Sequence, residues 1–135
     1  MRAENLPGLD RGGTSDPFVE IDFDGFEKAK TPVVKKECSP SWRNFEMSFE
    51  YETKFANQLH LKRLKLTVWD WNTFRNVIIG ETAVPLRRLC TGPVKQNLLL
   101  RDARNPRGRI KFDCEVHAVT DLTVTLSKLK VDITD

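Results

Sequence analysis

Short segments with an apolar residue at every second position recur along most of this chain. The alternation is clear between Phe45 and Tyr51 and again between Ile110 and Val116. Because successive side chains of a β-strand point to opposite faces, this pattern indicates strands with one buried and one solvent-facing side. Turn residues separate the segments at regular intervals, which predicts an all-β antiparallel sandwich. The eight predicted strands cover residues 19–23, 28–36, 45–51, 64–68, 78–84, 95–100, 109–117 and 122–131.

Length and cysteine content limit the class of protein. A chain of 135 residues is long enough to bury one core without disulfides, so we expect a single sandwich. Cys38, Cys90 and Cys114 are odd in number and form no Cys-x-x-Cys pair, which favours reduced thiols in a cytoplasmic protein. No apolar run approaches the length of about 18 residues that a membrane span needs, so we expect membrane contact to be peripheral.

Two local sequence features bear on the strand predicted over residues 28–36, one before it and one inside it. Asp24-Gly25 precedes it, and this dipeptide is typical of a two-residue hairpin turn that needs positive φ. Pro32 lies inside the predicted strand and cannot donate a ladder hydrogen bond, so the strand is expected at a sheet edge or at a bulge.

Two acidic loops carry the most distinctive chemistry of the sequence. Asp10 and Asp16 lie on a glycine-rich loop directly before the first strand, and Asp70 follows a later strand in the run Trp69 to Asn72. If the two loops meet, three carboxylates face one point, and hard oxygens of this kind suit a hard cation. The alternative is that aspartates beside glycine and proline only form turns.

Three motifs resemble those of C2 domains, in that family's order and at its spacing. The run Leu6 to Val19 is similar to the first calcium-binding loop, Ser39 to Asn44 resembles the Asn-Pro-x-Trp-Asn turn, and Trp69 to Gly80 resembles the third loop. The resemblance covers roughly Glu4 to Val116. It implies an eight-stranded Greek-key sandwich of permuted topology, from a multi-C2 or ferlin-like protein, that binds calcium and phospholipid.

The resemblance also implies a set of metal ligands. Asp10, Asp16 and Asp70 match three of the family's five aspartates, whereas Asn72 stands where the family usually has a fourth. The fifth position aligns with Val77, or with Asn76 if the gap in the shorter loop is placed differently.

Missing carboxylates predict weak calcium binding. With help from the carbonyls of Leu9 and Trp71, three carboxylates suffice for one divalent ion, while Arg11 and Arg75 add positive charge nearby. Fewer charged ligands move calcium sites toward dissociation constants on the order of 0.1 to 1 mM. We expect one weakly bound calcium ion, or none.

The expected lipid contacts are a basic groove and a loop tip. Lys28, Lys30, Lys36 and Lys65 resemble the lysine-rich groove with which many C2 domains bind phosphoinositides, although lysines on wet strand faces often serve solubility alone. Each lysine near an anionic leaflet contributes about 1 kcal/mol. Phe74 has no evident core role at the apex of the second acidic loop, and the resemblance implies that it enters the bilayer, with Arg11 and Arg75 beside it.

The last alternating segment presents a topological question. In the permuted fold a strand precedes the first acidic loop, but only Met1 to Asn5 stand there, whereas residues 122–131 form an additional strand. We therefore divide the chain into a C2 domain at residues 1–118 and an extra strand at residues 119–135. This strand either fills the vacant slot of its own domain, swaps into a second copy to form a dimer, or begins a following domain. We favour the first, because an open slot exposes sheet edges.

The sequence thus predicts a peripheral membrane-targeting module that binds anionic phospholipid in vesicle trafficking, exocytosis or signalling. The alternative is a degenerate C2 domain that binds a protein partner without calcium. We expect no enzymatic activity, since neither His60 nor His117 has a neighbouring nucleophile in the sequence. We expect no nucleic-acid partner, because the lysines are not interleaved with stacking aromatic residues.

Overall fold

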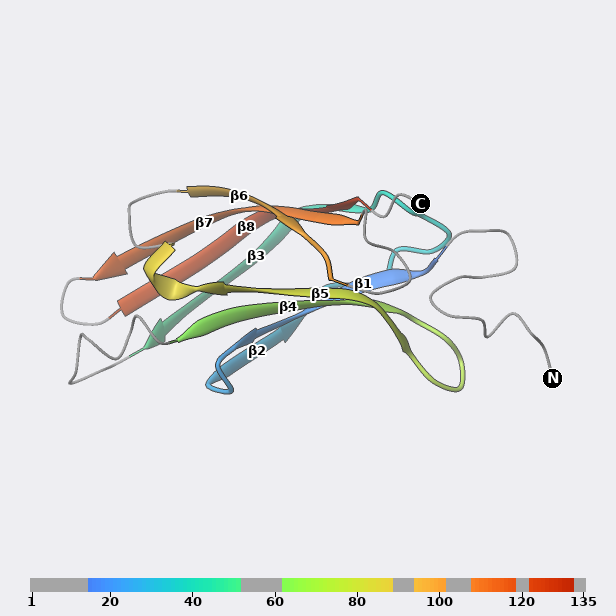
Figure 1. The fold of residues 1–135 in the computed structure, drawn as a ribbon, viewed down its shortest axis with the longest axis horizontal. Helices are drawn as coiled ribbons and strands as arrows, with labels where there is room; N and C mark the ends of the chain where they lie inside the picture. The colour runs from blue at the N-terminus through green and yellow to red at the C-terminus, as the bar shows by residue number, and fades with distance from the viewer. Residues whose placement is uncertain (1–14, 52–61, 89–93, 102–107, 119–121, 133–135) are drawn as a thin grey trace.

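The computed structural model describes residues 15–51, 62–88, 94–101, 108–118 and 122–132, and these form two sheets packed face to face (Figure 1). One sheet has the order β2-β1-β4-β5 and the other the order β3-β8-β7-β6, and every pairing is antiparallel. The predicted eight-stranded sandwich is confirmed. The strands are β1 (Pro17–Phe23), β2 (Glu27–Lys30), β3 (Ser41–Tyr51), β4 (Arg63–Asp70), β5 (Val77–Pro85), β6 (Val94–Leu99), β7 (Arg109–Ala118) and β8 (Leu122–Asp132), with a 3₁₀ helix η2 (Leu86–Arg88) after β5.

The alternating apolar residues of both sheets form one core between them. The rings of Phe23 on β1 and Phe49 on β3 lie with centroids 4.9 Å apart, so they join the two sheets directly. Cys114 is buried in this core, as a small apolar residue would be. Fully buried members from the other strands include Leu66, Val84, Ile110, Phe112, Leu126 and Val131.

The C-terminal strand lies inside a sheet of its own chain. β8 pairs with β3 on one side and with β7 on the other, so it occupies an interior position in the second sheet. The register on β7 shifts between Lys111 and Asp113, and Lys128 in β8 has a φ of 52°. This bulge restores the inward direction of Leu129 and Val131. The sandwich is therefore completed in cis, while the division of the chain at residue 118 stays a prediction.

The strand predicted over residues 28–36 is wrong beyond Lys30. The Thr31 side chain takes over one ladder position, because its Oγ1 accepts the Val19 N–H at 2.8 Å, and Pro32 has no N–H with which to continue. The chain then follows a loop whose Val34 N–H donates to the Pro17 carbonyl at 3.0 Å. Lys36 lies in this loop with a φ of 52°, and does not share a strand face with Lys28.

The turn before β2 has the predicted residues but a different register. Asp24 and Gly25 have φ values of 48° and 78°, and the Phe26 N–H donates to the Phe23 carbonyl at 2.8 Å. Both values are those of a type I′ turn. Phe23 is paired with Glu27, however, so three residues rather than two connect β1 and β2.

Candidate functional site

Asp16 and Asp70 meet at one end of the sandwich, here called the loop end, because β1 pairs with β4. Pro17 at the start of β1 is opposite Asp70 at the end of β4, and Asp16 directly precedes Pro17. The Asp16 N–H donates to Oδ1 of Asp70 at 2.9 Å, across 54 residues of sequence. In return, the Trp71 N–H donates to the Asp16 carbonyl at 2.9 Å. These bonds fix both aspartates at one end of the sandwich.

The loop that follows β2 closes one side of this site. The Lys36 N–H donates to Oδ1 of Asp16 at 2.7 Å, and the Glu37 N–H donates to the carbonyl of fully buried Ser15 at 2.9 Å. Trp42 anchors the same loop, since its indole N–H donates to the Pro32 carbonyl at 2.8 Å. The backbone around Asp16 is thus held on two sides, which orients its carboxylate.

The position of Asp70 disfavours the ionised form of its carboxyl. Its side chain is buried, with 1% exposed, and burial raises the pKa of its carboxyl above the usual 3.8. The hydrogen bond from the Asp16 N–H opposes this increase, while the negative charge of Asp16 adds to it. A cation beside the two carboxylates would offset both the desolvation and the repulsion.

The second acidic loop is closed by amide side chains. The Asn72 N–H donates to the side-chain oxygen of Asn76 at 3.2 Å, and Nδ2 of Asn72 lies 3.5 Å from the Asp70 carbonyl. The resemblance gave Asn76 or Val77 as the position of the fifth aspartate. In this structure the Asn76 amide holds the loop together, and Val77 is the first residue of β5.

The remaining predicted ligands and one predicted lipid contact, Leu9, Asp10 and Arg11, lie outside the described residues. Within the described ranges, no cluster of three or more His, Cys, Asp or Glu side chains suited to a metal is present. Asp16 and Asp70 nevertheless fit a hard cation, because both are oxygen donors and Asp16 has one carboxylate oxygen outside the hydrogen bonds given above. The carboxyl of Asp70 also has a hydrogen bond with the Asn72 side chain. The amide oxygen of Asn72 lies on the same loop.

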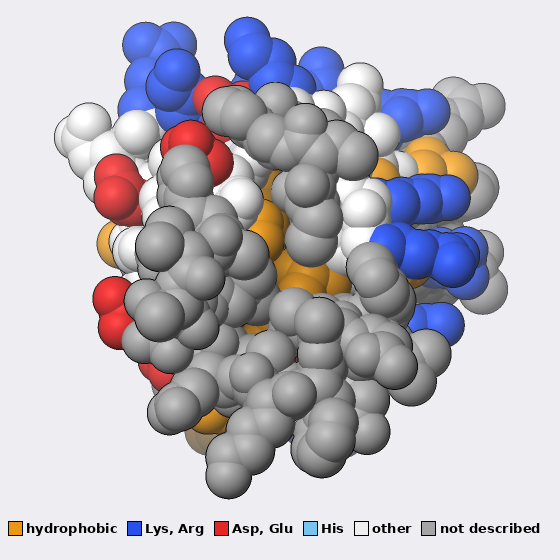
Figure 2. All heavy atoms as spheres, turned by 90° about the vertical axis from the view of Figure 1, so that its left-hand side faces the viewer, with side chains coloured by type: hydrophobic (Ala, Val, Ile, Leu, Met, Phe, Trp, Pro, Cys, Tyr) orange, Lys and Arg blue, Asp and Glu red, His pale blue; other side chains and the backbone are white. Residues whose placement is uncertain are grey.

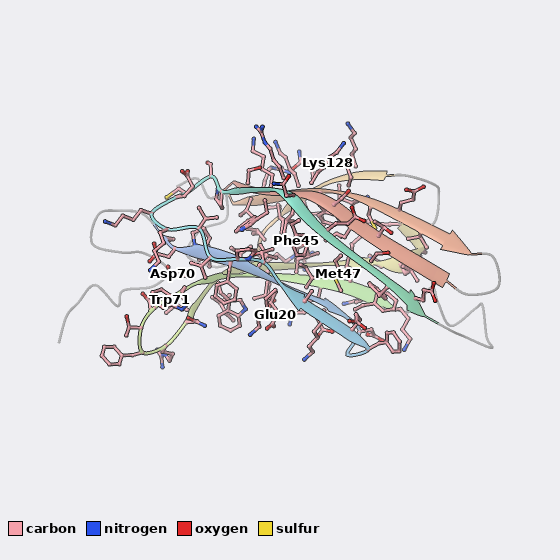
Figure 3. All side chains as sticks on the ribbon, turned by 180° about the vertical axis from the view of Figure 1, so that it is seen from behind. Glu20, Phe45, Met47, Asp70, Trp71 and Lys128 are labelled. Carbon is pink, nitrogen blue, oxygen red and sulfur yellow. The ribbon has the colours of Figure 1, made fainter. Side chains whose placement is uncertain are left out.

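The tip of this loop presents an apolar side chain to solvent. Phe74 is 91% exposed, by far the most exposed large hydrophobic residue among those described. Trp71, at the base of the loop, is 36% exposed, and the Lys35 ammonium lies 4.3 Å from the centroid of its ring. Figure 3 shows Asp70 and Trp71 together at the loop end. Arg75 is also exposed beside Phe74.

Lys35 was missed by the sequence analysis. Its contact with Trp71 depends on how the loop after β2 returns to the second acidic loop. The only signal in the sequence is the adjacent pair Lys35-Lys36, which does not show that Lys35 approaches an aromatic ring.

The predicted basic groove has mixed charge. Lys28, Lys30 and Lys65 lie on the outer face of the first sheet, and each is close to a carboxylate. The nitrogen–oxygen distances are 3.9 Å for Lys28–Asp22, 4.0 Å for Lys30–Glu20 and 3.5 Å for Lys65–Glu81. The fourth predicted member, Lys36, is at the loop end beside Asp16. The outer face therefore carries less positive charge than its lysines alone suggest.

Comparison with known proteins agrees with the fold and with the sequence motifs. The family model described as "C2 domain" matches residues 1–100. The chain is 40% identical to mouse Ras GTPase-activating protein 4 over 92 residues, which are 67% of this chain and 11% of that protein. It is 39% identical to mouse synaptotagmin-7 over 95 residues, which are 66% of this chain and 22% of that protein.

A solved structure has the same fold. A C2 domain of plant extended synaptotagmin 1 superposes with a TM-score of 0.60 at 23% identity, covering 96% of this chain and 87% of that one. The chain thus spans only about a tenth to a fifth of the curated relatives named above. Within the described residues, no helix has the length and apolar character needed to cross a membrane.

Proposed function

Because the chain belongs to the C2 domain family, we propose that it is a peripheral module that binds membranes containing anionic phospholipid. The observation that carries this proposal is the exposure of Phe74, 91%, at the end of the sandwich that holds Asp16 and Asp70. An exposed phenylalanine on a loop tip gains about 1.5 to 3 kcal/mol when it is fully transferred out of water. This gain is absent while the ring stays in water.

Charged residues around Phe74 support contact with an anionic surface. Arg75 follows it directly, and Lys35 stands over the Trp71 ring at the base of the loop. Basic residues at a membrane surface contribute about 1 kcal/mol each, within the Debye length of the lipid headgroups. We infer that insertion of Phe74 and these charges act together.

Calcium would assist this contact by weak binding at the loop end. Asp16, Asp70 and Asn72 would hold the ion, with Asp10 as the further carboxylate that the family resemblance implies. A bound cation supplies positive charge that offsets the repulsion between the carboxylates and attracts phosphate groups. Since two of the family's five aspartates are replaced, we propose one weakly bound ion.

Vesicle sedimentation tests the membrane proposal. The protein is mixed with phosphatidylcholine vesicles that do or do not contain phosphatidylserine, with and without about 1 mM calcium, which fills roughly half or more of a weak site. Phe74→Ala should weaken the apparent affinity for vesicles at least about five-fold, which corresponds to about 1 kcal/mol. Phe26→Ala is the matched control, because Phe26 is 52% exposed at the opposite end of β1.

A protein-binding module is the second candidate. The carboxylates beside Lys28, Lys30 and Lys65 favour it, since a face with both charge signs suits a protein surface better than a uniformly anionic one. Absence of binding to either kind of vesicle, with and without calcium, would support this alternative and contradict the membrane proposal. Both candidates act by binding rather than catalysis, and a place in cytoplasmic vesicle traffic stays a prediction.

A further inference from the structure

The second sheet has a long free edge at β3. Within the described residues, β3 pairs with β8 on one side only, and the strand order places nothing on its other side. Figure 3 shows β3 in front of the other strands of this sheet. Alternate residues of an edge strand point their N–H and C=O groups away from the sheet, where another extended chain can pair with them. The register with β8 shifts between Trp42 and Glu46, so the regular part of this edge is Glu46–Tyr51, here called the β3 edge.

The other three sheet edges are less open to such pairing. β2 has only four residues and ends two residues before Pro32. β5 is joined by the chain after β6, where the Arg101 N–H donates to the Glu81 carbonyl at 2.8 Å. β6 carries Lys95, and lysine commonly protects an edge strand from further pairing. The β3 edge contains no proline, no lysine and no register shift, so none of these devices protects it.

Two glutamates give the β3 edge a negative charge. Glu46 and Glu50 lie four residues apart on the solvent-facing side of β3, and both are exposed. Their neighbours across the ladder are the uncharged residues Ser127 and Thr123 of β8. No ion pair within the described part of the chain involves either glutamate. The described residues therefore leave this negative charge uncompensated.

Side chains on the two faces of the β3 edge limit the sequence that can pair with it. Ser48 lies between the two glutamates, and its hydroxyl oxygen is 3.0 Å from that of Thr125 on β8. Met47 and Phe49 face the core, with 7% and 9% exposed. Residues opposite each other on paired strands share a face. A matching strand therefore alternates between charged or polar residues outside and apolar residues inside.

The charge of the β3 edge disfavours a second copy of the chain as its occupant. If two copies paired through this edge, four glutamates would lie in one short two-stranded segment, and like charges opposite each other destabilise a sheet. Basic residues opposite Glu46 and Glu50 would gain from opposite charges as well as from ladder hydrogen bonds. Figure 2 shows acidic side chains along its left margin, on the side of β2 and β3, whereas basic side chains gather along the right and upper margins. This separation attracts a basic segment to the β3 side.

We propose that the β3 edge binds an extended basic segment of a partner protein, which adds as a fifth strand to the four-stranded second sheet. The segment has Lys or Arg at two positions four residues apart, a small polar residue midway between them, and apolar residues at the two remaining positions. The site is separate from the loop end, because Phe49 packs on Phe23, at the end of β1 opposite to Pro17. Binding here does not depend on Phe74, on calcium or on the function proposed above.

Fluorescence anisotropy with a labelled synthetic peptide tests the charge of the site. The probe is Ser-Lys-Val-Thr-Val-Lys-Ser, and the same peptide with glutamate in place of lysine should bind at least about ten-fold more weakly. Glu46→Gln/Glu50→Gln should weaken binding of the basic probe at least about five-fold. The matched control is Glu20→Gln/Asp22→Asn, which removes the same charge from the first sheet and should weaken binding less than about two-fold. Absence of binding at about 1 mM probe, or equal weakening in both variants, would overturn the proposal.

Methylation of the peptide nitrogens tests whether the probe adds as a strand. Alternate residues of a strand donate to opposite sides, so methylating one alternate set removes the N–H groups that face β3, and methylating the other removes those that face solvent. One methylated probe should therefore bind at least about ten-fold more weakly than the parent peptide, and the other within about three-fold. This comparison uses the parent protein, so it does not depend on the folding of a variant.

Two further results would contradict strand addition. Equal weakening by both methylation patterns would mean that the peptide is held by charge alone. A parent protein that sediments as a dimer, and is dissociated by Glu46→Lys/Glu50→Lys without binding the probe, would mean that a second copy occupies the edge. Hydrogen exchange gives the positive counterpart, since the probe should slow exchange at alternate amides of Glu46–Tyr51 and leave the amides of β6 unchanged.

Discussion

The carboxylate of Asp70 accepts the backbone N–H of Asp16 at 2.9 Å, while the Trp71 N–H donates to the carbonyl of Asp16. This reciprocal contact extends the pairing of β1 with β4 by one residue at the loop end. It places an ionisable group in a buried position where a neutral hydrogen-bonding residue would cost less to desolvate. Such an arrangement is expected where function rather than stability selects the residue.

The raised pKa of Asp70 predicts how stability depends on pH. A carboxyl whose pKa is higher in the folded than in the unfolded state binds its proton more tightly when folded. Its contribution to stability is therefore fully present below the unfolded value of 3.8, and is lost as pH rises through the raised folded value. Relative to the parent, Asp70→Asn should gain stability as pH increases from about 3 to 7, measured by urea unfolding without calcium.

Asp16→Asn is the control for this prediction, because it removes the neighbouring negative charge but leaves Asp70 in place. It should reduce the pH dependence of the parent without abolishing it. Calcium should restore the stability of the parent at neutral pH, and should have little effect on Asp70→Asn. If the difference between the parent and Asp70→Asn is independent of pH, burial does not raise the pKa of Asp70.

The space around Gly80 is too small for a side chain. A Cβ atom at this position would lie 2.9 Å from Cβ of Leu100, which is buried and cannot rotate away. Gly80→Ala should therefore destabilise the domain by about 1 to 3 kcal/mol through overpacking, as measured by chemical denaturation. Ala83→Ser, at an exposed position of the same strand, should change the free energy of unfolding by less than about 0.5 kcal/mol. Similar effects of the two substitutions would contradict this explanation.

The sequence was sufficient for the presence of the eight strands and for the contact between Asp16 and Asp70. Alternation at period two identified β1, β3, β4, β7 and β8, and the residues around Asp16 and Asp70 predicted the end of the sandwich where these two aspartates meet. The extent of β2 was not predictable, because the Thr31 hydroxyl replaces a backbone partner just before Pro32. Periodicity does not report this competition between side-chain and backbone hydrogen bonds.

The sequence alone also did not predict which charged side chains on neighbouring strands lie close together. Lys28 and Lys30 could be assigned to one face from their spacing, but their neighbours Asp22 and Glu20 follow from the register of β1 with β2. Arg88 and Arg101 approach Arg63 only because η2 and the chain after β6 both return to β5. Residues brought together by register and by long connections leave no local pattern.

The acidic neighbours of the lysines give a direct test of the outer face of the first sheet. If this face contacts anionic lipid, Glu20→Gln/Asp22→Asn should strengthen binding to phosphatidylserine vesicles by up to about 30-fold, at about 1 kcal/mol for each charge. Glu46→Gln/Glu50→Gln changes the same charge at exposed residues of the second sheet, and should have a smaller effect. Equal strengthening in both variants would mean that only net charge matters, and that this face is not the contact surface.

Reversing one of two opposed lysine charges, Lys111 and Lys130, should stabilise the second sheet. They are directly opposite each other on β7 and β8, and both are exposed. Like charges at opposed positions destabilise a sheet, whereas opposite charges contribute roughly 0.2 to 1 kcal/mol. Lys130→Glu should therefore raise the free energy of unfolding at low salt, and 1 M sodium chloride should remove most of the gain through screening, since the Debye length is then about 3 Å.

Lys28→Glu is the matched control, because Lys28 already faces Asp22 at 3.9 Å, and this substitution should lower the free energy of unfolding. Stabilisation by both substitutions would show that the overall charge of the domain, rather than the opposition of these two lysines, determines the effect.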